Sequence, residues 1–328
     1  MKRRTHLGQL LATSLAMAAS ALPGAAWSAG YPERPITLVV PFTAGGPTDT
    51  IARIVAEDMT RTLGQPVIIE NKPGASTIIG AQQVARAKPD GYTLLVATPG
   101  TLVTNQFLYK DIPYNADRDL DLVQMLSVSP LIAVVSPKSA IKDFDDLITR
   151  AKANPNQLSF ASVGVGGVYQ LAFERLQEIA GIKMTHVPYK GSSQALVDVM
   201  SGVVDMMFDT PTSALPHIQA GKLRPIAVTS PQRFALLPEV PTIDARYPAF
   251  DSAIVWAGLV APKGLPPDVR ARIKSAVDAA LSSEKYLQAA RNFGLEPLKP
   301  WSSDDLSKFI TGQRARWGDV IKRANIHI

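Results

Sequence analysis

The sequence contains no cysteine and only four histidines among its 328 residues. The absence of cysteine excludes disulfides, thiolate nucleophiles, cysteine-ligated zinc and iron–sulfur clusters. His186 and His217 lie outside any HExxH pattern, so we expect no zinc site and no metal of any kind. The sequence also lacks a P-loop and a GxSxG elbow, and residues 164–169 begin like a dinucleotide fingerprint but end in Tyr169. These absences predict a protein that is not an enzyme and that needs no cofactor.

The first 28 residues have the pattern of a signal peptide. Basic residues at 2–4 precede a mostly apolar stretch at 7–22, and the small residues Ala26 and Ser28 stand before the expected cleavage point. The apolar stretch is too short and too polar for a membrane anchor, which needs about 20 continuous apolar residues. Sec and twin-arginine export both fit the basic start. We expect an exported, soluble mature chain, periplasmic in a cell with two membranes.

The mature chain carries little net charge. The formal charge of +6 loses Lys2, Arg3 and Arg4 with the signal peptide and becomes +3 (6 − 3). Nucleic-acid-binding proteins usually gather positive charge on one face or stripe, whereas the basic residues here are scattered. We therefore expect no nucleic-acid partner. With 46% hydrophobic residues, the chain has enough apolar material for about two domains.

Strand and helix patterns alternate along the mature chain. The first set has strands at 36–40, 67–70 and 93–97, with helices starting at an N-cap Thr48 and near Ile78. Strands and helices at this spacing predict a parallel sheet with covering helices. The later strands are expected at 131–135, 158–161, 185–187, 203–208, 224–228 and 252–260, and the later helices at 144–153, 267–281, 284–293 and 303–324. Two more helices are expected, one that carries Leu171 and Leu176 and stops at Gly181, and one that starts at Ser192 and stops near Gly202.

Three glycine-rich loops follow predicted strand ends, at 43–50, 74–77 and 162–167. Ligands of open α/β sheets bind outside the carboxyl ends of the strands, where free N–H groups and helix dipoles attract anions. Each loop carries Ser or Thr hydroxyls, and none contains Arg or Lys. The pattern predicts a carboxylate or similar anion held by neutral donors. A tight turn is the plain alternative for any single loop.

Long stretches of the mature chain match one known family in order and spacing. The stretches are YPERPITLVVPFTAGGPTDTIAR (31–53), GQPVIIENKPGASTIIGA (64–81), AKPDGYTLLVATPG (87–100), KANPNQLSFASVGVGG (152–167), HVPYKGSSQALVDVMSGVVDMMFD (186–209), AGKLRPIAVTSPQR (220–233), LPEVPTI (237–243) and WAGLVAPKGLP (256–266). With them the chain resembles the substrate-binding proteins of tripartite tricarboxylate transporters, also called Bug receptors.

The resemblance implies an α/β, two-lobed periplasmic binding protein of the Venus-flytrap type, each lobe a mixed sheet flanked by helices. Its expected lobes are 29–130 plus 253–328, and 131–252. It implies a monomer that binds a small carboxylate, whether a dicarboxylate, an amino-acid-like acid or an aromatic acid, and delivers it to membrane transporter subunits. A hydrolase or isomerase on a similar scaffold, and a receptor that reports to a sensor kinase, stay open as alternatives.

The resemblance also places the ligand carboxylate against the first-lobe loops, with the second lobe closing on it. Ser76 departs from the family, which commonly has glycine there, and Gly167 and Tyr169 stand where it often has Ser and His. Asp49 is interpreted as a first-turn helix residue, and Asp209 either accepts from the ligand or caps backbone. The implied ligand-binding residues are Phe42, Thr43, Ala44, Gly45, Gly46, Thr48, Ala75, Ser76, Thr77, Thr98, Ser162, Gly166, Gly167, Tyr169, Lys190, Gly191 and Asp209.

Overall fold

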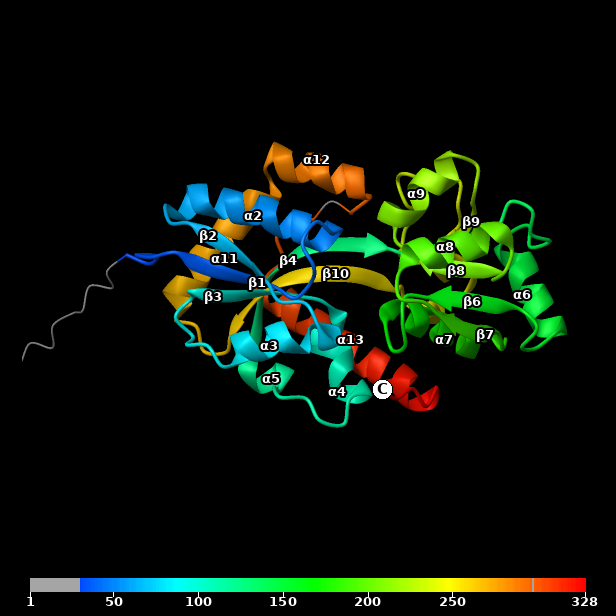
Figure 1. Cartoon of the computed structure of the whole chain (residues 1–328), viewed down its shortest axis with the longest axis horizontal. Helices are drawn as coiled ribbons and strands as arrows, with labels where there is room; N and C mark the ends of the chain where they lie inside the picture. Colours follow the sequence, from blue (N-terminus) through cyan, green and yellow to red (C-terminus); the bar gives the residue numbers. More distant parts are fainter. Residues whose placement is uncertain (1–29, 297) are drawn as a thin grey trace, which may run out of the picture.

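Two five-stranded sheets form the centres of two lobes that lie side by side along the long axis of the molecule (Figure 1). The computed structural model describes residues 30–296 and 298–328, so the predicted signal peptide at 1–28 lies outside the described residues. The strand orders are β2-β1-β3-β10-β4 and β7-β6-β8-β5-β9. Both sheets are mixed and flanked by helices, which confirms the predicted fold class.

The first sheet combines a parallel half with an antiparallel half. β1, β2 and β3 pair in parallel, as predicted, whereas β10 runs antiparallel to both β3 and β4. The long strand β4 was not predicted, and it forms one edge of the sheet. The strands are β1 (Ile36–Val40), β2 (Val67–Asn71), β3 (Thr93–Ala97), β4 (Leu120–Pro130) and β10 (Ile254–Pro262).

Helices cover both faces of this first sheet. α2 and α11 pack together on one face, where alternate β1 residues such as Leu38 are fully buried, and α3 and α13 cover the other face (Figure 1). The helices of this lobe are α2 (Pro47–Leu63), η1 (Ala75–Thr77), α3 (Ile78–Ala85), η2 (Gly100–Thr104), α4 (Asn105–Leu108), α5 (Ala116–Asp119), α11 (Pro267–Leu281), α12 (Glu284–Phe293) and α13 (Ser303–Arg323).

The start of α2 differs from the prediction. The helix begins at Pro47, and Gly46 is its N-cap without a side-chain hydrogen bond, so Thr48 is not the cap but lies in the first turn. Proline suits the first helical position because its φ is already helical and because the N–H that it lacks would have no partner there.

The second sheet is built in the same way. β6 pairs in parallel with β7 and β8, and β5 runs antiparallel to β8 and β9. The predicted strand at 203–208 begins only at Met206, because Gly202 at φ 82° ends the preceding helix and a turn follows. The elements are β5 (Ile132–Val135), α6 (Phe144–Ala153), β6 (Ser159–Ser162), α7 (Val168–Ala180), β7 (Thr185–Pro188), α8 (Ser192–Ser201), β8 (Met206–Asp209), α9 (Pro211–Gln219), β9 (Arg224–Val228), α10 (Ile243–Arg246) and η3 (Pro248–Phe250).

The chain crosses between the sheets at two neighbouring points. Thr229 joins them: its Oγ1 accepts from Leu131 N at 2.7 Å, and its carbonyl accepts from Ala253 N at 3.2 Å. Leu131 directly follows β4, and Ala253 directly precedes β10. We propose these crossings as the boundaries between lobe 29–130 plus 253–328 and lobe 131–252.

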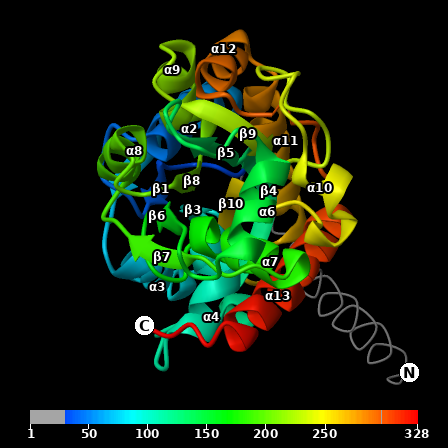
Figure 2. The ribbon, with the colours of Figure 1, turned by 90° about the vertical axis from the view of Figure 1, so that its right-hand side faces the viewer.

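Beyond the crossings, the lobes meet on two opposite sides of the molecule. α9 lies beside α12 on one side, and α7 lies beside α13 on the other (Figure 2). On the first side, Thr212 Oγ1 donates to Phe293 O at 2.8 Å. On the second side, Arg323 of α13 pairs with Glu178 of α7 at 2.6 Å. The space between the two sheets is therefore enclosed by contacts on both flanks.

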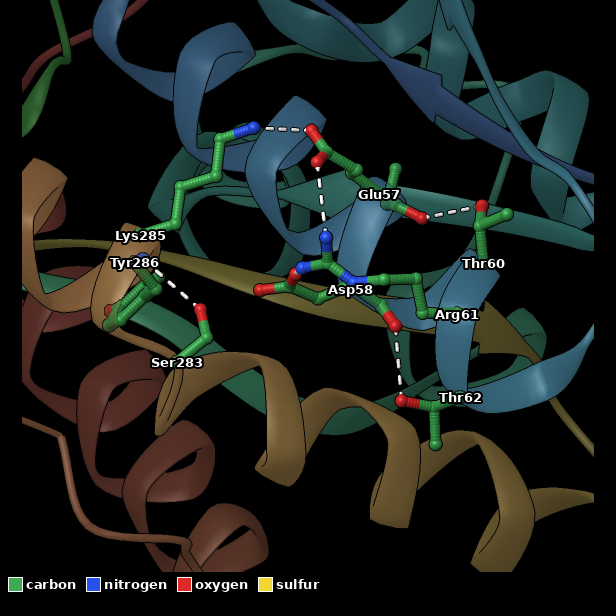
Figure 3. Close-up of polar contacts among 9 residues, drawn as sticks. Glu57, Asp58, Thr60, Arg61, Thr62, Ser283, Lys285 and Tyr286 are labelled. Carbon is green, nitrogen blue, oxygen red and sulfur yellow. Dashed lines mark hydrogen bonds and ion pairs between the residues drawn. The ribbon is translucent and has the colours of Figure 1, made fainter.

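α12 reaches the second lobe from a position that is fixed on the first. Lys285 forms an ion pair with Glu57 of α2, and Ser283 caps α12 by accepting from Tyr286 N at 3.1 Å (Figure 3). The Tyr286 hydroxyl donates to Leu126 O of β4 at 2.7 Å from a buried position. The exposed ion pair contributes little because solvent screens it, so the buried tyrosine is the stronger anchor.

None of the helices within 30–296 and 298–328 combines the length and apolar character of a membrane span.

Candidate functional site

A cavity of about 260 Å³ lies between the two lobes, and hydroxyl groups form most of its polar lining. Its volume is just below the roughly 300–1,000 Å³ of sites for drug-sized ligands, which suits a small organic acid. None of the described residues that line it is charged. The lining residues are Pro47, Thr48, Ile51, Thr98, Ser127, Ser129, Tyr169, Ser192, Thr210, Thr212, Ser213, Val255, Trp256, Ala257 and Leu295.

Other hollows on the described surface offer a different chemistry. A groove of about 720 Å³ between α7 and α13 contains the Arg323–Glu178 ion pair. Another, of about 360 Å³, holds the ion pairs of Arg270 with Asp121 and of Arg314 with Asp117. These two hollows contain paired charges, whereas the lining between the lobes is neutral and rich in hydroxyl groups.

The first-lobe wall begins at the N-terminus of α2. Thr48 lies in the first helical turn, where backbone N–H groups have no intrahelical partner and the helix dipole adds partial positive charge. Thr98, which follows β3, lies beside it in the wall. Free N–H groups with hydroxyls beside them suit a carboxylate.

Ser127 and Ser129 of β4 extend this wall, and sequence reasoning missed both. They alternate with Leu126 and Val128, whose side chains are buried, so the two hydroxyls share the face that lines the cavity. The alternation Leu-Ser-Val-Ser at 126–129 is the signal for a strand with one polar face, and it was available in the sequence.

The second-lobe wall comes from two helix starts and from α7. Ser192 is the first residue of α8, Thr210 is the N-cap of α9, and Thr212 and Ser213 follow in its first turn. Tyr169, in the first turn of α7, completes this wall. The pair Thr-Pro at 210–211 is a helix-start signal that could have revealed α9.

Asp209 lies directly behind that second wall. It is 0% exposed, and its Oδ1 accepts from Ser192 Oγ and from Thr210 N, both at 2.8 Å. Its Oδ2 has no hydrogen-bond partner within the described part of the chain. Burial raises the pKa of Asp209 to about 7, although the hydrogen bonds from Ser192 and Thr210 act to lower it. Asp209 therefore both caps backbone, as one of the two interpretations expected, and keeps one free oxygen.

The loop before α2 is held from behind by Asp49. Asp49 is buried, and its carboxylate accepts from Gly45 N at 2.9 Å and from Arg53 Nε at 2.8 Å. Burial alone would raise the pKa of Asp49, but the hydrogen bonds from Arg53, Asn71 and Gly45 outweigh it and lower the pKa. Asp49 thus fixes the loop from within, as a first-turn residue does.

The remaining predicted positions of this loop do not line the cavity. Thr43, Ala44 and Gly45 are exposed, and Phe42 and Gly46 are partly buried. Phe42 packs against the first-lobe core, and its carbonyl accepts from Asn71 Nδ2 at 3.0 Å. Gly45 has φ 88° and needs to be glycine, whereas Gly46 has φ −76° and does not.

The second predicted loop uses its hydroxyls within the first lobe. Ser76 Oγ lies 2.7 Å from Tyr109 Oη, and Thr77 Oγ1 lies 2.8 Å from Thr101 Oγ1. Ala75 belongs to η1 between β2 and α3. Neither Ser76 nor Thr77 lines the cavity.

The third predicted loop, at 162–167, also turns its polar groups inward. Ser162 is fully buried, donates to Gly164 O at 2.9 Å and lies 2.6 Å from His186 Nε2. Burial lowers the pKa of His186, so its imidazole is neutral. A serine–histidine pair could suggest a nucleophile, but this hydroxyl is buried and its proton is engaged by Gly164 O.

Gly166 and Gly167 form the end of that loop, where it meets the first lobe. Gly166 has φ 73°, and a Cβ there would lie 2.5 Å from Leu108 Cδ1 of α4, so the loop packs closely across the gap between the lobes. Gly167 is the N-cap of α7. Lys190 is exposed, and Gly191 is the N-cap of α8; neither lines the cavity, although the adjacent Ser192 does.

Comparisons with known sequences agree on one family. The sequence profile of TctC, the tripartite tricarboxylate transporter family receptor, matches residues 51–326. A UPF0065 protein from the tcbD–tcbE intergenic region of Pseudomonas sp. strain P51 is 39% identical over 89% of this chain and 86% of its own length. BugT of Bordetella pertussis is 35% identical over 97% of both chains.

Solved structures show the same similarity. Rpa4515 of R. palustris with adipate has a TM-score of 0.77 at 32% identity, over 91% of this chain and 100% of that one. MatC of Rhodopseudomonas palustris with bound malate has a TM-score of 0.74 at 32% identity, over 89% and 100%. The periplasmic binding protein BugD has a TM-score of 0.74 at 34% identity, over 91% and 100%. The predicted periplasmic-binding-protein fold is therefore confirmed.

Proposed function

This chain belongs to the tripartite tricarboxylate transporter receptor family, and on this premise we propose that it binds a small organic carboxylate between its lobes. The family is one of solute receptors and not of enzymes. We further propose that it works in the periplasm and delivers this acid to the subunits of a tripartite tricarboxylate-type membrane transporter. The relatives with bound adipate and malate support a carboxylate as the ligand class.

The observation that carries the proposal is the neutral, hydroxyl-lined cavity beside the α2 N-terminus. A carboxylate needs several donors, and Thr48, Thr98 and Ser127 offer hydroxyls near the free N–H groups of the first turn of α2. Hydrogen bonds to a charged group contribute about 1.5–3 kcal/mol each. Three such bonds are sufficient for specific binding without an Arg or Lys partner.

A receptor also explains the arrangement of the walls. Donors from the first lobe and hydroxyls from the second face one cavity, so a ligand that contacts both favours the closed arrangement of the lobes. A hydrolase would need an accessible nucleophile, and the Ser162–His186 pair does not supply one because Ser162 is fully buried. The geometry therefore favours binding over turnover.

The test is a thermal-shift screen of the mature chain, residues 29–328, against a library of carboxylates. A ligand at 100 times its Kd should add about 2.7 kcal/mol to the free energy of unfolding. Ser213→Leu places a larger side chain in the cavity wall and should abolish the shift, whereas Ser193→Leu, on the exposed surface of α8, should keep it. If no carboxylate stabilises the chain, or if both variants respond like the wild type, the proposal is wrong.

A further inference from the structure

The second-lobe wall of the cavity contains a hydroxyl whose proton is already committed. Ser192 lines the cavity, and its Oγ donates to Asp209 Oδ1 at 2.8 Å. A serine hydroxyl has one proton and two lone pairs. While Asp209 is ionised it can only accept, so Ser192 gives its proton inward and presents lone pairs to the cavity. The wall at Ser192 is then an acceptor.

Within residues 30–296 and 298–328, the buried carboxylate of Asp209 forms no ion pair. β5 places Ile132 opposite it, α8 contributes Ser192, and the N-cap of α9 contributes Thr210. The titratable group that faces it is Tyr169 of α7, whose pKa is raised by burial and by the Asp209 charge, so its hydroxyl stays protonated. An uncompensated buried carboxylate attracts donors and cations.

The two walls therefore differ in the hydrogen bonds that they offer. The first-lobe wall presents the free N–H groups of α2 and suits a carboxylate. The second-lobe wall has Asp209 behind Ser192, and the Asp209 Oδ2 atom is buried without a partner among the described residues. A ligand that spans the cavity meets free backbone donors at one end and the Ser192 acceptor at the other.

We propose, resting on the function proposed above, that the Ser192–Asp209 pair binds a hydrogen-bond-donating substituent of the ligand, a hydroxyl or an ammonium group. The ligand class is then a hydroxycarboxylate or an aminocarboxylate, and an acid that carries carboxylates alone fits less well. Ser192 is the contacting residue, and Asp209 positions its proton.

Protonation of Asp209 would reverse this preference. A neutral Asp209 carries its own proton, which it can donate to Ser192, and the Ser192 proton is then free to point into the cavity. The wall at Ser192 becomes a donor and favours a plain carboxylate. Because burial places the pKa of Asp209 at about 7, the exchange falls within a range of pH that is easy to reach in solution.

The test is calorimetric titration of the mature chain at pH 6.5 and 8.5 with three matched series of acids. These are succinate, malate and aspartate; glutarate, 2-hydroxyglutarate and glutamate; and phenylacetate, mandelate and phenylglycine. We expect a substituted acid to bind at least about tenfold more tightly than its parent, equivalent to about 1.4 kcal/mol. This advantage should grow from pH 6.5 to 8.5.

Two variants separate this inference from a general effect on the fold. Asp209→Asn should reduce the preference for a substituted acid over its parent acid below about threefold, and this preference should no longer depend on pH. Ser192→Ala should reduce the same preference. Ser193→Ala, one residue along α8 and exposed, is the matched control and should change nothing.

The inference is wrong if a parent acid binds as tightly as its substituted relatives at both pH values, if no substituted acid binds, or if the preference persists in Asp209→Asn. The function proposed above would survive each of these results, provided that some carboxylate still stabilises the mature chain in the thermal-shift screen.

Discussion

The Oδ2 atom of Asp49 accepts a hydrogen bond from the backbone N–H of Gly45 at 2.9 Å, so the first turn of α2 holds the loop that precedes it. Asn71 of β2 strengthens the same arrangement, because its Nδ2 donates to Asp49 Oδ1 at 2.8 Å and to Phe42 O at 3.0 Å. The side chain of Asp49 thus supports the cavity wall from outside the cavity.

Asp49→Asn should weaken ligand binding without unfolding the chain. The variant loses charge-assisted hydrogen bonds to Gly45 and Arg53, and the loop before Thr48 loosens. A net loss of about 1–1.5 kcal/mol corresponds to a roughly five- to tenfold fall in affinity. Asp146→Asn is the matched control, since Asp146 likewise accepts from a backbone N–H and from an arginine, but on α6. Equal effects of both variants on affinity would contradict this role.

Gly166→Ala should lower affinity by disturbing the contact between the lobes. An alanine Cβ would lie 2.5 Å from Leu108 Cδ1, so α4 and the loop before α7 would have to move apart. Gly181→Ala is the control: its φ of 63° imposes similar backbone strain, about 1–2 kcal/mol, in open space. We expect both variants to have a lower melting temperature, but only Gly166→Ala to bind the ligand more weakly in calorimetric titration. Adding Leu108→Val, which removes the Cδ atoms, should restore binding; failure to do so would exclude the steric explanation.

The stability of the ligand-free chain should depend on Asp209 between about pH 4 and pH 7. Burial raises the pKa of Asp209 from 3.8 to about 7. Between these values the folded chain binds more protons at this site than the unfolded chain, so its stabilising contribution is complete below about pH 4 and is lost as the pH rises through 7. In melting curves from pH 5 to 8, the melting temperature of the wild type should fall by several degrees relative to that of Asp209→Asn. Parallel curves would argue against the raised pKa.

Binding should depend on hydroxyl groups more than on positive charge. Thr48 lies in the cavity wall, whereas Lys190 is exposed and outside it. Thr48→Val keeps the side-chain shape but removes one hydrogen bond to a charged group, which should cost about 1.5–3 kcal/mol and at least tenfold in affinity. Lys190→Ala should reduce ligand affinity by less than twofold. Calorimetric titration of both variants compares them directly, and the reverse order would point to an ionic site.

Removal of metal ions should leave ligand affinity unchanged within about twofold. No cluster of three or more His, Asp or Glu side chains suited to a metal ion occurs in the parts of the chain that the structure describes. Titrations with and without EDTA test this expectation. A tenfold loss of affinity with the chelator would show that an ion takes part in binding.

Local patterns were sufficient to predict most elements of the fold. α6 has the predicted bounds 144–153, because Asp143 caps it and its apolar residues recur on one face, as at Phe144 and Leu147. β4 was missed because its pattern changes along the strand: residues 122–126 are all buried, and only 126–129 alternate clearly. Its pairing with β10, far away in the sequence, decides its conformation.

The site was harder to predict than the fold, since hydroxyl orientation depends on neighbours that are distant in sequence. Thr48, Thr98 and Tyr169, which the resemblance implies as ligand-binding residues, line the cavity, and their contact with a ligand stays a prediction. Ser162 faces His186 of the neighbouring strand instead, which no loop pattern could indicate. Ser127 contributes to the same cavity from a strand that was not predicted.

The most direct test of the central proposal is a crystal structure of the mature chain with the carboxylate that stabilises it most in the thermal-shift screen. We predict that the ligand carboxylate lies between the lobes, within hydrogen-bond distance of the α2 N-terminus and of the Thr48, Thr98 or Ser127 hydroxyls. No Lys or Arg side chain and no metal ion should lie within about 4 Å of it. A ligand bound outside this cavity, or a carboxylate paired with a basic side chain or a metal ion, would contradict the proposal.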